Sequence, residues 1–170
     1  MLMGVKSGYA KYPCFFCHFD SRNSEVDFCA NHQWERRETF NLAPLISPSK
    51  IAFPVLHLKL GLCQVFIKNL DSECECFQYV RQKFRKSDAK LENGVLNGPE
   101  IRLILKDTEF INKMTSIEQN AWEAFRVVAF EVLSKSYSSC WQQKIDNLIE
   151  CYKTLGVSRM TIKKAPFVQT

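Results

Sequence analysis

Apolar residues recur at helical spacing through most of the chain that follows Pro54. The first such stripe consists of Leu58, Leu62, Val65, Phe66 and Leu70. Residues three, four, seven and eight positions apart share one face of an α-helix, so this stripe predicts an amphipathic helix over residues 57–70. A second helix is expected after Ser72, because Ser72 and Glu75 match the capping-box pattern. Its inner face would consist of Cys76, Phe77, Val80 and Phe84.

Shorter helical segments are expected between residues 87 and 105. Ser87 is a candidate cap for a short turn that runs to Leu91, and Asn93-Gly94 is typical of a turn. The pair Gly98-Pro99 predicts a helix start, since proline is well tolerated at the first helical position. Ile101, Ile104 and Leu105 would then face the core.

Two longer helices are predicted toward the C-terminus. Ser116 and Gln119 form a candidate capping box before a stripe made of Ala121, Phe125, Val128, Ala129 and Val132. Trp122, Val127 and Phe130 make the other side apolar too, which predicts that this helix is the central, most buried one. Ser139 and Gln142 repeat the box before the last stripe, and Gly156 is the expected stop. The last stripe consists of Trp141, Ile145, Leu148, Ile149 and Tyr152.

The N-terminal third has a different pattern. Strand-forming residues, which include Tyr12, Phe15 and Phe16, alternate with glycine and polar residues up to about residue 40. Three of the six prolines then fall between residues 41 and 55, which excludes a continuous helix there. The predicted fold is mainly α (α+β), with a small N-terminal β-hairpin and a five- to six-helix, bundle-like body. The expected divisions are a head at 1–40, a connector at 41–55, the body at 56–160 and a basic tail at 161–170, all in one compact unit.

Composition is that of a globular protein with a real core. Of the 170 residues, 46% are hydrophobic, and 13 are phenylalanine. No run approaches the roughly 18 apolar residues of a membrane span, so no membrane association is expected. Eight cysteines are spread along a helical chain that has no signal-peptide pattern, which predicts a reducing, intracellular location in the nucleus or cytosol.

Four metal-ligand candidates lie close together near the N-terminus. Cys14 and Cys17 form one pair, and Cys29 and His32 form a second pair with the same spacing. Thiolate and imidazole are ligands that zinc prefers, and two such pairs can surround one tetrahedral ion. The sequence therefore predicts a zinc knuckle. The alternative is a β-hairpin with ordinary half-buried cysteines and a surface His32, and His57 is a further candidate ligand from a distance.

Other candidate sites are weaker. The spacing of Cys74 and Cys76 is too tight for a usual zinc pair, so these two are interpreted as a small core residue and its neighbour. There is no phosphate-binding glycine loop, no nucleophile elbow and no H-E-x-x-H motif. No catalytic residues and no small-molecule substrate are therefore predicted.

A basic surface is expected on the outer face of the second helix. It consists of Arg81, Lys83, Arg85 and Lys86, with Lys90 nearby, in a chain whose net charge is +5. Such a run can contact the phosphates of DNA, although a basic helix exterior is more often a solvated face. The other expected partner is a protein that binds the helical body.

Four segments also resemble a known group of sequences. They are GYAKYPCFFCHFDSR, PVLHLKLGL, KSDAKLENGVLNGPEIRLILKD and ECYKTLGVSRMTIK. In this order along nearly the whole chain they resemble an uncharacterised, transposon-derived protein family of arthropod and cnidarian genomes. Its pattern is similar to the zinc-binding internal region of RNase H-like, DDE-type transposases, in which a cysteine pair is followed far downstream by histidines.

The resemblance carries over to particular residues. Cys14 and Cys17 match the cysteine pair of that family, and His57 matches the histidine of its LHIKLGL motif. Cys29 and His32 have no counterpart there, and neither the downstream histidines nor the catalytic acids are present. The resemblance thus implies a fragment truncated at both ends, without activity of its own. The expected function is zinc binding with a nucleic-acid- or protein-binding role. The alternatives are a vestigial structural product, or part of a nuclease if flanking segments exist.

Overall fold

The computed structural model describes residues 11, 12, 18, 45, 55–134 and 139–157. The chain divides into two compact units, of which one spans residues 54–160 and contains almost all the described residues. The predicted β-hairpin head and proline connector lie outside the described residues, apart from isolated positions.

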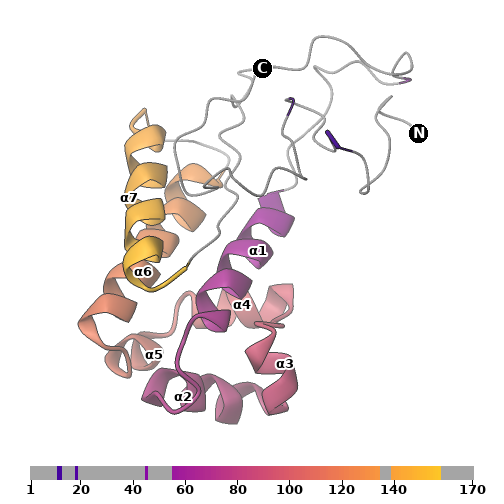
Figure 1. The fold of residues 1–170 in the computed structure, drawn as a ribbon, viewed down its shortest axis with the longest axis vertical. Coiled ribbons are helices and arrows are strands. Elements are labelled where there is room, and N and C mark those ends of the chain that lie inside the picture. Colours follow the sequence, from indigo (N-terminus) through magenta and orange to yellow (C-terminus); the bar gives the residue numbers. More distant parts are fainter. Residues whose placement is uncertain (1–10, 13–17, 19–44, 46–54, 135–138, 158–170) are drawn as a thin grey trace. The chain divides into compact units, whose positions relative to one another are not determined.

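The described residues of this unit are mainly helical, and no strand occurs among them (Figure 1). This confirms the mainly helical prediction. The elements are α1 (Val55–Lys68), α2 (Glu75–Phe84), α3 (Asp88–Glu92), α4 (Gly98–Ile104), α5 (Thr108–Asn112), α6 (Ser116–Val127), the π-helical turn η2 (Val128–Val132) and α7 (Trp141–Thr154). The short helix α5 was not expected from the sequence. No helix in this part of the chain is long and apolar enough to cross a membrane.

The core is centred on Trp122 of α6, which is fully buried. Its ring lies 4.9 Å from that of Phe66, 5.0 Å from that of Phe110 and 5.3 Å from that of Phe125, measured between centroids. The hydroxyl of Tyr152 donates a hydrogen bond to the carbonyl of Leu62 at 3.1 Å. The aromatic side chains of α1, α5, α6 and α7 therefore meet in one cluster.

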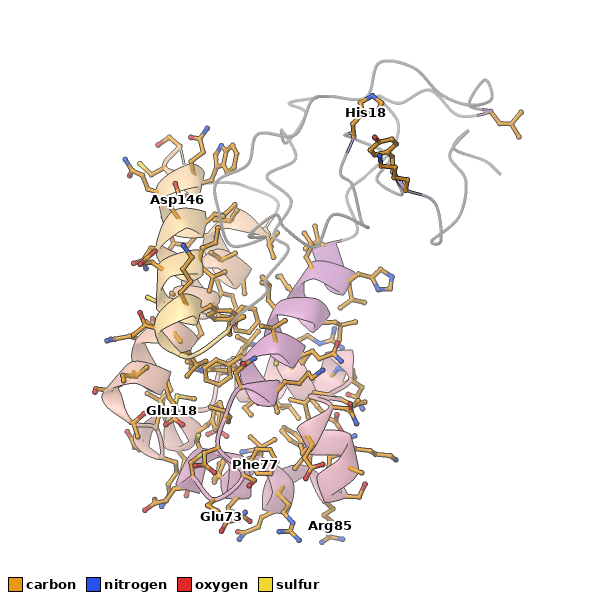
Figure 2. All side chains as sticks on the ribbon, in the orientation of Figure 1. His18, Glu73, Phe77, Arg85, Glu118 and Asp146 are labelled. Atoms are coloured by element: carbon orange, nitrogen blue, oxygen red, sulfur yellow. The ribbon has the colours of Figure 1, made fainter. Side chains whose placement is uncertain are left out.

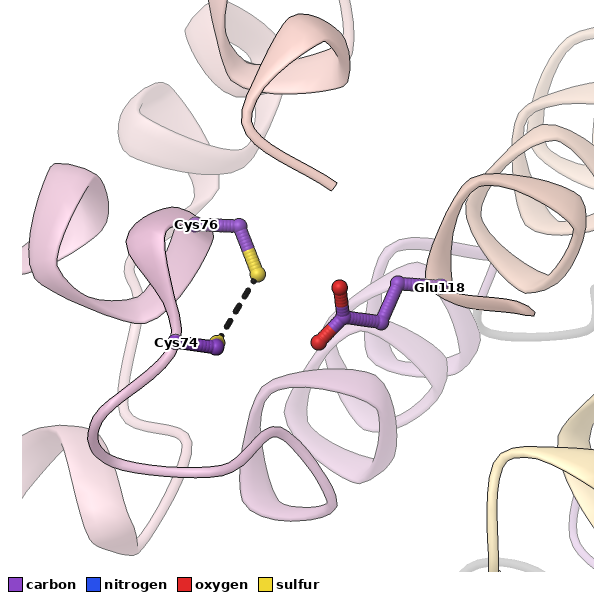
Figure 3. A group of neighbouring side chains, drawn as sticks. All are labelled: Cys74, Cys76 and Glu118. Atoms are coloured by element: carbon purple, nitrogen blue, oxygen red, sulfur yellow. Dashed lines mark hydrogen bonds between the residues drawn. The ribbon is translucent and has the colours of Figure 1, made fainter. Parts of the chain in front are cut away.

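Packing around this cluster joins helices that are distant in sequence. α6 packs along α7, α1 contacts α3, α4 and α6, and α2 contacts α5 (Figure 1). Ion pairs reinforce the α2–α5 contact: Lys83 binds Asp107 at 2.6 Å and Lys113 binds Glu75 at 3.2 Å. Figure 3 shows the start of α2, with Cys74 and Cys76, opposite Glu118 of α6.

Most predicted core positions are confirmed, with one clear exception. The stripe from Ala121 to Val132 is buried throughout, and Ile145, Leu148, Ile149 and Tyr152 of the last stripe are buried as well. Phe130, expected on a second buried side, is 46% exposed. Phe130 follows Ala121 by nine positions, which at about 100° per residue puts it on the side opposite the buried stripe, so its apolar side chain and not its spacing led to the wrong expectation.

Three predicted helix caps are wrong, each by one or two residues. The N-cap of α2 is Cys74 instead of Ser72, and that of α6 is Thr115 instead of Ser116. The N-cap of α7 is Cys140, without a side-chain hydrogen bond, instead of Ser139. The correct box for α6 is Thr115 with Glu118, and this shift has consequences for the site described next.

Candidate metal centre

Cys74 and Cys76 lie at the start of α2. Cys74 is the N-cap residue, and its Sγ accepts a hydrogen bond from the backbone N–H of Phe77 at 3.4 Å. Cys76 lies on the apolar stripe of α2 and is fully buried, as the sequence predicts. Cys74 is non-helical and Cys76 is in the first turn, so the chain brings the two sulfurs to 3.1 Å from each other.

Glu118 approaches the same point from α6. Its Oε2 accepts hydrogen bonds from the backbone N–H of Thr115 at 2.7 Å and from the Thr115 hydroxyl at 2.8 Å. The backbone bond from Thr115 and the reciprocal bond from the Glu118 N–H to the Thr115 hydroxyl, at 3.4 Å, form the capping box of α6 and fix the direction of the Glu118 side chain. Glu118 is only 7% exposed, which is unusual for a carboxylate.

The three side chains form one cluster. Their potential ligand atoms all lie within 4.8 Å of one another. Figure 3 shows the carboxylate of Glu118 directed from α6 toward the two thiols at the start of α2. Zinc binds thiolate sulfur at about 2.3 Å and carboxylate oxygen at about 2.0–2.2 Å. Two sulfurs bound tetrahedrally at that distance lie roughly 3.8 Å apart, so the two thiols, 3.1 Å apart here, would separate slightly to bind one ion. Three protein ligands would leave a fourth position for water or another donor.

The electrostatics of the cluster favour a cation. Burial raises the pKa of the Cys76 thiol, and both Cys74 and Glu118 raise it further. Burial also raises the pKa of Cys74, an effect that hydrogen bonds from Cys76 and Phe77 only partly offset. Among the ion pairs of the described residues, none involves Glu118. Three groups that become anionic on ionisation thus share a half-buried to buried site without a positive partner, and a divalent metal would supply one.

The metal ligands predicted from sequence are other residues than these three. Cys14, Cys17, Cys29 and His32 lie outside the described residues, so the zinc knuckle stays a prediction. His57 is exposed in the first turn of α1 and belongs to no cluster of metal-ligand side chains in the part of the chain that the structure describes.

The predicted basic surface is partly occupied by internal ion pairs. Lys83 donates to Asp107 and to the Tyr79 hydroxyl, and Lys86 pairs with Glu100 at 2.9 Å. Arg81, Arg85 and Lys90 are exposed, and Figure 2 shows Arg85 on the outside of the unit near the end of α2.

A sequence signal for Glu118 existed. It precedes Trp122 by four positions and Phe125 by seven, so it falls on the apolar face of its own helix. An acid on such a face requires a buried partner. The predicted capping box, one residue too late, put Gln119 instead of Glu118 at the third helical position. The tight spacing of the two cysteines gave no reason to look for a further candidate ligand on another helix.

Comparison with protein families places this site inside a recognised domain. A family model described as a domain of unknown function (DUF8704) matches residues 55–147, more than half of the 170-residue chain. The chain belongs to the DUF8704 family. The matched region runs from the first residue of α1 into α7 and includes Cys74, Cys76 and Glu118. A second domain of unknown function (DUF8703) matches residues 1–46. No curated protein and no solved structure matches the chain.

Proposed function

We propose that this DUF8704 chain is a non-catalytic, zinc-binding module of a transposase-like protein. In its helical body, Cys74, Cys76 and Glu118 hold one zinc ion that fastens the start of α2 to the start of α6. The transposase-like origin rests on the sequence resemblance. The observation that carries the metal site is the convergence of two thiols and a buried carboxylate that forms no ion pair among the described residues.

The role of such an ion would be structural. Structural zinc sites contribute directly to folding free energy, because the ligands are brought together only in the folded chain. All five described cysteines are unbridged, which supports action in a reducing compartment such as the nucleus or cytosol. The module would then present its surfaces to a nucleic acid or to a protein partner.

Zinc content tests this proposal. The full chain is purified under reducing conditions and dialysed, and zinc per chain is measured by elemental analysis. We expect Glu118→Gln and Cys76→Ser to lower the content by about one ion per chain. Gln can still form the capping box, so Glu118→Gln removes the carboxylate charge without removing the helix cap.

Two control variants separate the body site from other effects. Cys63 is also fully buried but lies outside the cluster, so Cys63→Ser controls for placing a serine hydroxyl in the core. It is expected to keep the wild-type zinc content. Cys17→Ser tests the predicted N-terminal site independently. If Glu118→Gln and Cys76→Ser retain all the zinc of the wild type, or the wild type holds none, the body site does not exist.

A further inference from the structure

The surface of the helical body has a groove that shares no residue with the metal cluster. It has a volume of about 510 Å³ and is formed by α1, α4 with the two residues that follow it, and η2. Its lining residues are Val55, Leu56, Lys59, Leu60, Gly98, Ile101, Arg102, Leu105, Lys106 and Phe130. This size is within the range of ligand-binding pockets in proteins.

Large apolar side chains in the groove are exposed. Leu56 is 52% exposed and Phe130 is 46% exposed, although both are large hydrophobic residues. Phe130 belongs to the π-helical turn, and π-helical turns of this kind occur frequently at functional sites. Together with Leu60, Ile101 and Leu105 these residues make a mostly aliphatic floor.

The charges around this floor have one sign. Lys59, Arg102 and Lys106 line the groove, and none of the described residues that line it is acidic. None of these three takes part in the ion pairs of the described residues, whereas Lys83, Lys86 and Lys144 are each paired with an acid. A partner that covered the floor would also reduce the hydration of these cations, so it must bring negative charge.

We propose that this groove binds an acidic amphipathic helix of a partner protein. Apolar side chains of that helix cover Leu56, Ile101 and Phe130, and its flanking Asp or Glu residues pair with the three cations. This is the helix-in-groove mode, in which apolar residues at positions i, i+3 or i+4, and i+7 occupy the groove. Residues 98–106 extend for roughly 12 Å at a helical rise of 1.5 Å per residue, which suits about two turns of the partner.

Other occupants fit the groove less well. An extended peptide that adds a strand needs a sheet edge, and the described residues contain no strand. A polyproline II peptide docks between several aromatic side chains, and the described lining residues include one, Phe130. A helix satisfies its own backbone groups and can therefore lie on an aliphatic floor. Single-stranded nucleic acid would match the cations, but it stacks its bases on aromatic rings, and Phe130 is the one aromatic side chain among the described residues that line the groove.

Selection from a displayed library of random 16-residue peptides tests the proposal on the full chain. We expect enriched peptides to have apolar residues at helical spacing with Asp or Glu beside them. Synthetic copies, labelled with a fluorophore, should bind the wild type and lose at least about tenfold in affinity for Arg102→Glu, because the variant places an acid against an acid. Leu56→Ser should weaken binding as well, through lost apolar contact.

Matched variants outside the groove provide the controls. Arg85→Glu makes the same charge change on α2, and Leu103→Ser makes the same polar change at a 61% exposed residue of α4 that does not line the groove. Both should bind the peptides as the wild type does.

The proposal is overturned if no peptide is enriched, if enriched peptides lack acids, or if the groove and control variants bind them equally. It is also overturned if a labelled DNA duplex binds with the same dependence on Arg102 while the peptides do not. Glu118→Gln alters no groove residue, so this test is independent of the metal site.

Discussion

In the proposed metal site, Glu118 would combine two tasks that usually fall to different residues. Its Oε2 closes the capping box with Thr115, while a carboxylate has capacity for further partners through its two oxygens. The cap holds the side chain in one direction before any metal binds, so part of the ordering cost of a ligand is already met. Of the two thiols at the start of α2, Cys74 is oriented by a hydrogen bond from the Phe77 N–H, and no backbone hydrogen bond orients Cys76 in the described part of the chain.

The turn between α3 and α4 approaches α1 closely at Gly94. Its φ is 64°, and a Cβ there would lie 2.4 Å from the backbone carbonyl oxygen of Gln64. We expect Gly94→Ala to lower the free energy of unfolding by at least about 1–2 kcal/mol, from the left-handed backbone alone, and by more from the clash. Urea denaturation of the purified chain measures this change.

Gly61 is the matched control, because it lies within α1 and a Cβ there would meet nothing within 4 Å. Gly61→Ala should raise the free energy of unfolding by about 0.5–1 kcal/mol, since alanine has the higher helix propensity. Equal effects of the two substitutions would contradict the described approach of the turn to α1.

At the scale of the elements, one acid joins α2 to α5. Asp107 caps α5 through Oδ1, which accepts from the Glu109 N–H at 3.1 Å, and its Oδ2 accepts from Lys83 and Tyr79. Burial alone would raise the pKa of Asp107, but the hydrogen bonds and charge of Lys83, with the Tyr79 hydroxyl, outweigh it and lower that pKa. The ionised carboxylate therefore stabilises the fold.

Replacing Asp107 with Asn should reveal this contribution by its pH dependence. Asn keeps the cap and removes the charge, so the expected loss at neutral pH is about 0.2–1 kcal/mol, the range of exposed ion pairs. A lowered folded-state pKa gives stability that is present above the unfolded value near pH 3.9 and is lost as the pH falls through the folded value. The difference between wild type and Asp107→Asn should thus shrink below about pH 4.

Denaturation curves from pH 3 to pH 8 give that difference directly, and Asp107→Ala shows what the cap adds. A wild-type advantage over Asp107→Asn that grows toward pH 3 would mean that the ion pair does not stabilise the fold.

The helices could be predicted because their apolar stripes are long. The residue at which each helix starts could not be predicted. Thr115 with Glu118 and Ser116 with Gln119 both satisfy the capping-box pattern, and local sequence does not choose between them. The structure has the box of Thr115 with Glu118, and Glu118 is buried there beside the cysteines of α2. The same long-range contact explains why Cys74 and Cys76, interpreted separately, gave no metal site. The cap at Cys74 was missed because sulfur is an uncommon cap acceptor.

At the scale of the whole molecule, the net charge of +5 leaves nucleic-acid binding as a prediction. Because Lys83 and Lys86 are paired with acids of the same chain, we expect the exposed Arg85 and Lys90 to make the phosphate contacts. If the chain binds a DNA duplex, replacing Arg85 and Lys90 with Ala should reduce the slope of log affinity against log salt, by up to about two units for two lost phosphate contacts.

Replacing Lys83 and Lys86 with Ala should change this slope less, because both already neutralise acids of the same chain. Binding titrations at several salt concentrations compare the two double variants. No binding at low salt would remove nucleic acid from the proposed partners, and a larger effect of Lys83 and Lys86 would contradict the importance of their internal pairs.

The coordination of zinc in the body tests the central proposal most directly. The double variant Cys14→Ser/Cys17→Ser removes the predicted N-terminal pair and leaves Cys74, Cys76 and Glu118 in place. X-ray absorption at the zinc edge of this variant, loaded with one equivalent of zinc, should show two sulfur neighbours at about 2.3 Å and oxygen or nitrogen neighbours at about 2.0–2.2 Å. A zinc shell without sulfur, or a variant that retains no zinc after dialysis, would contradict the account.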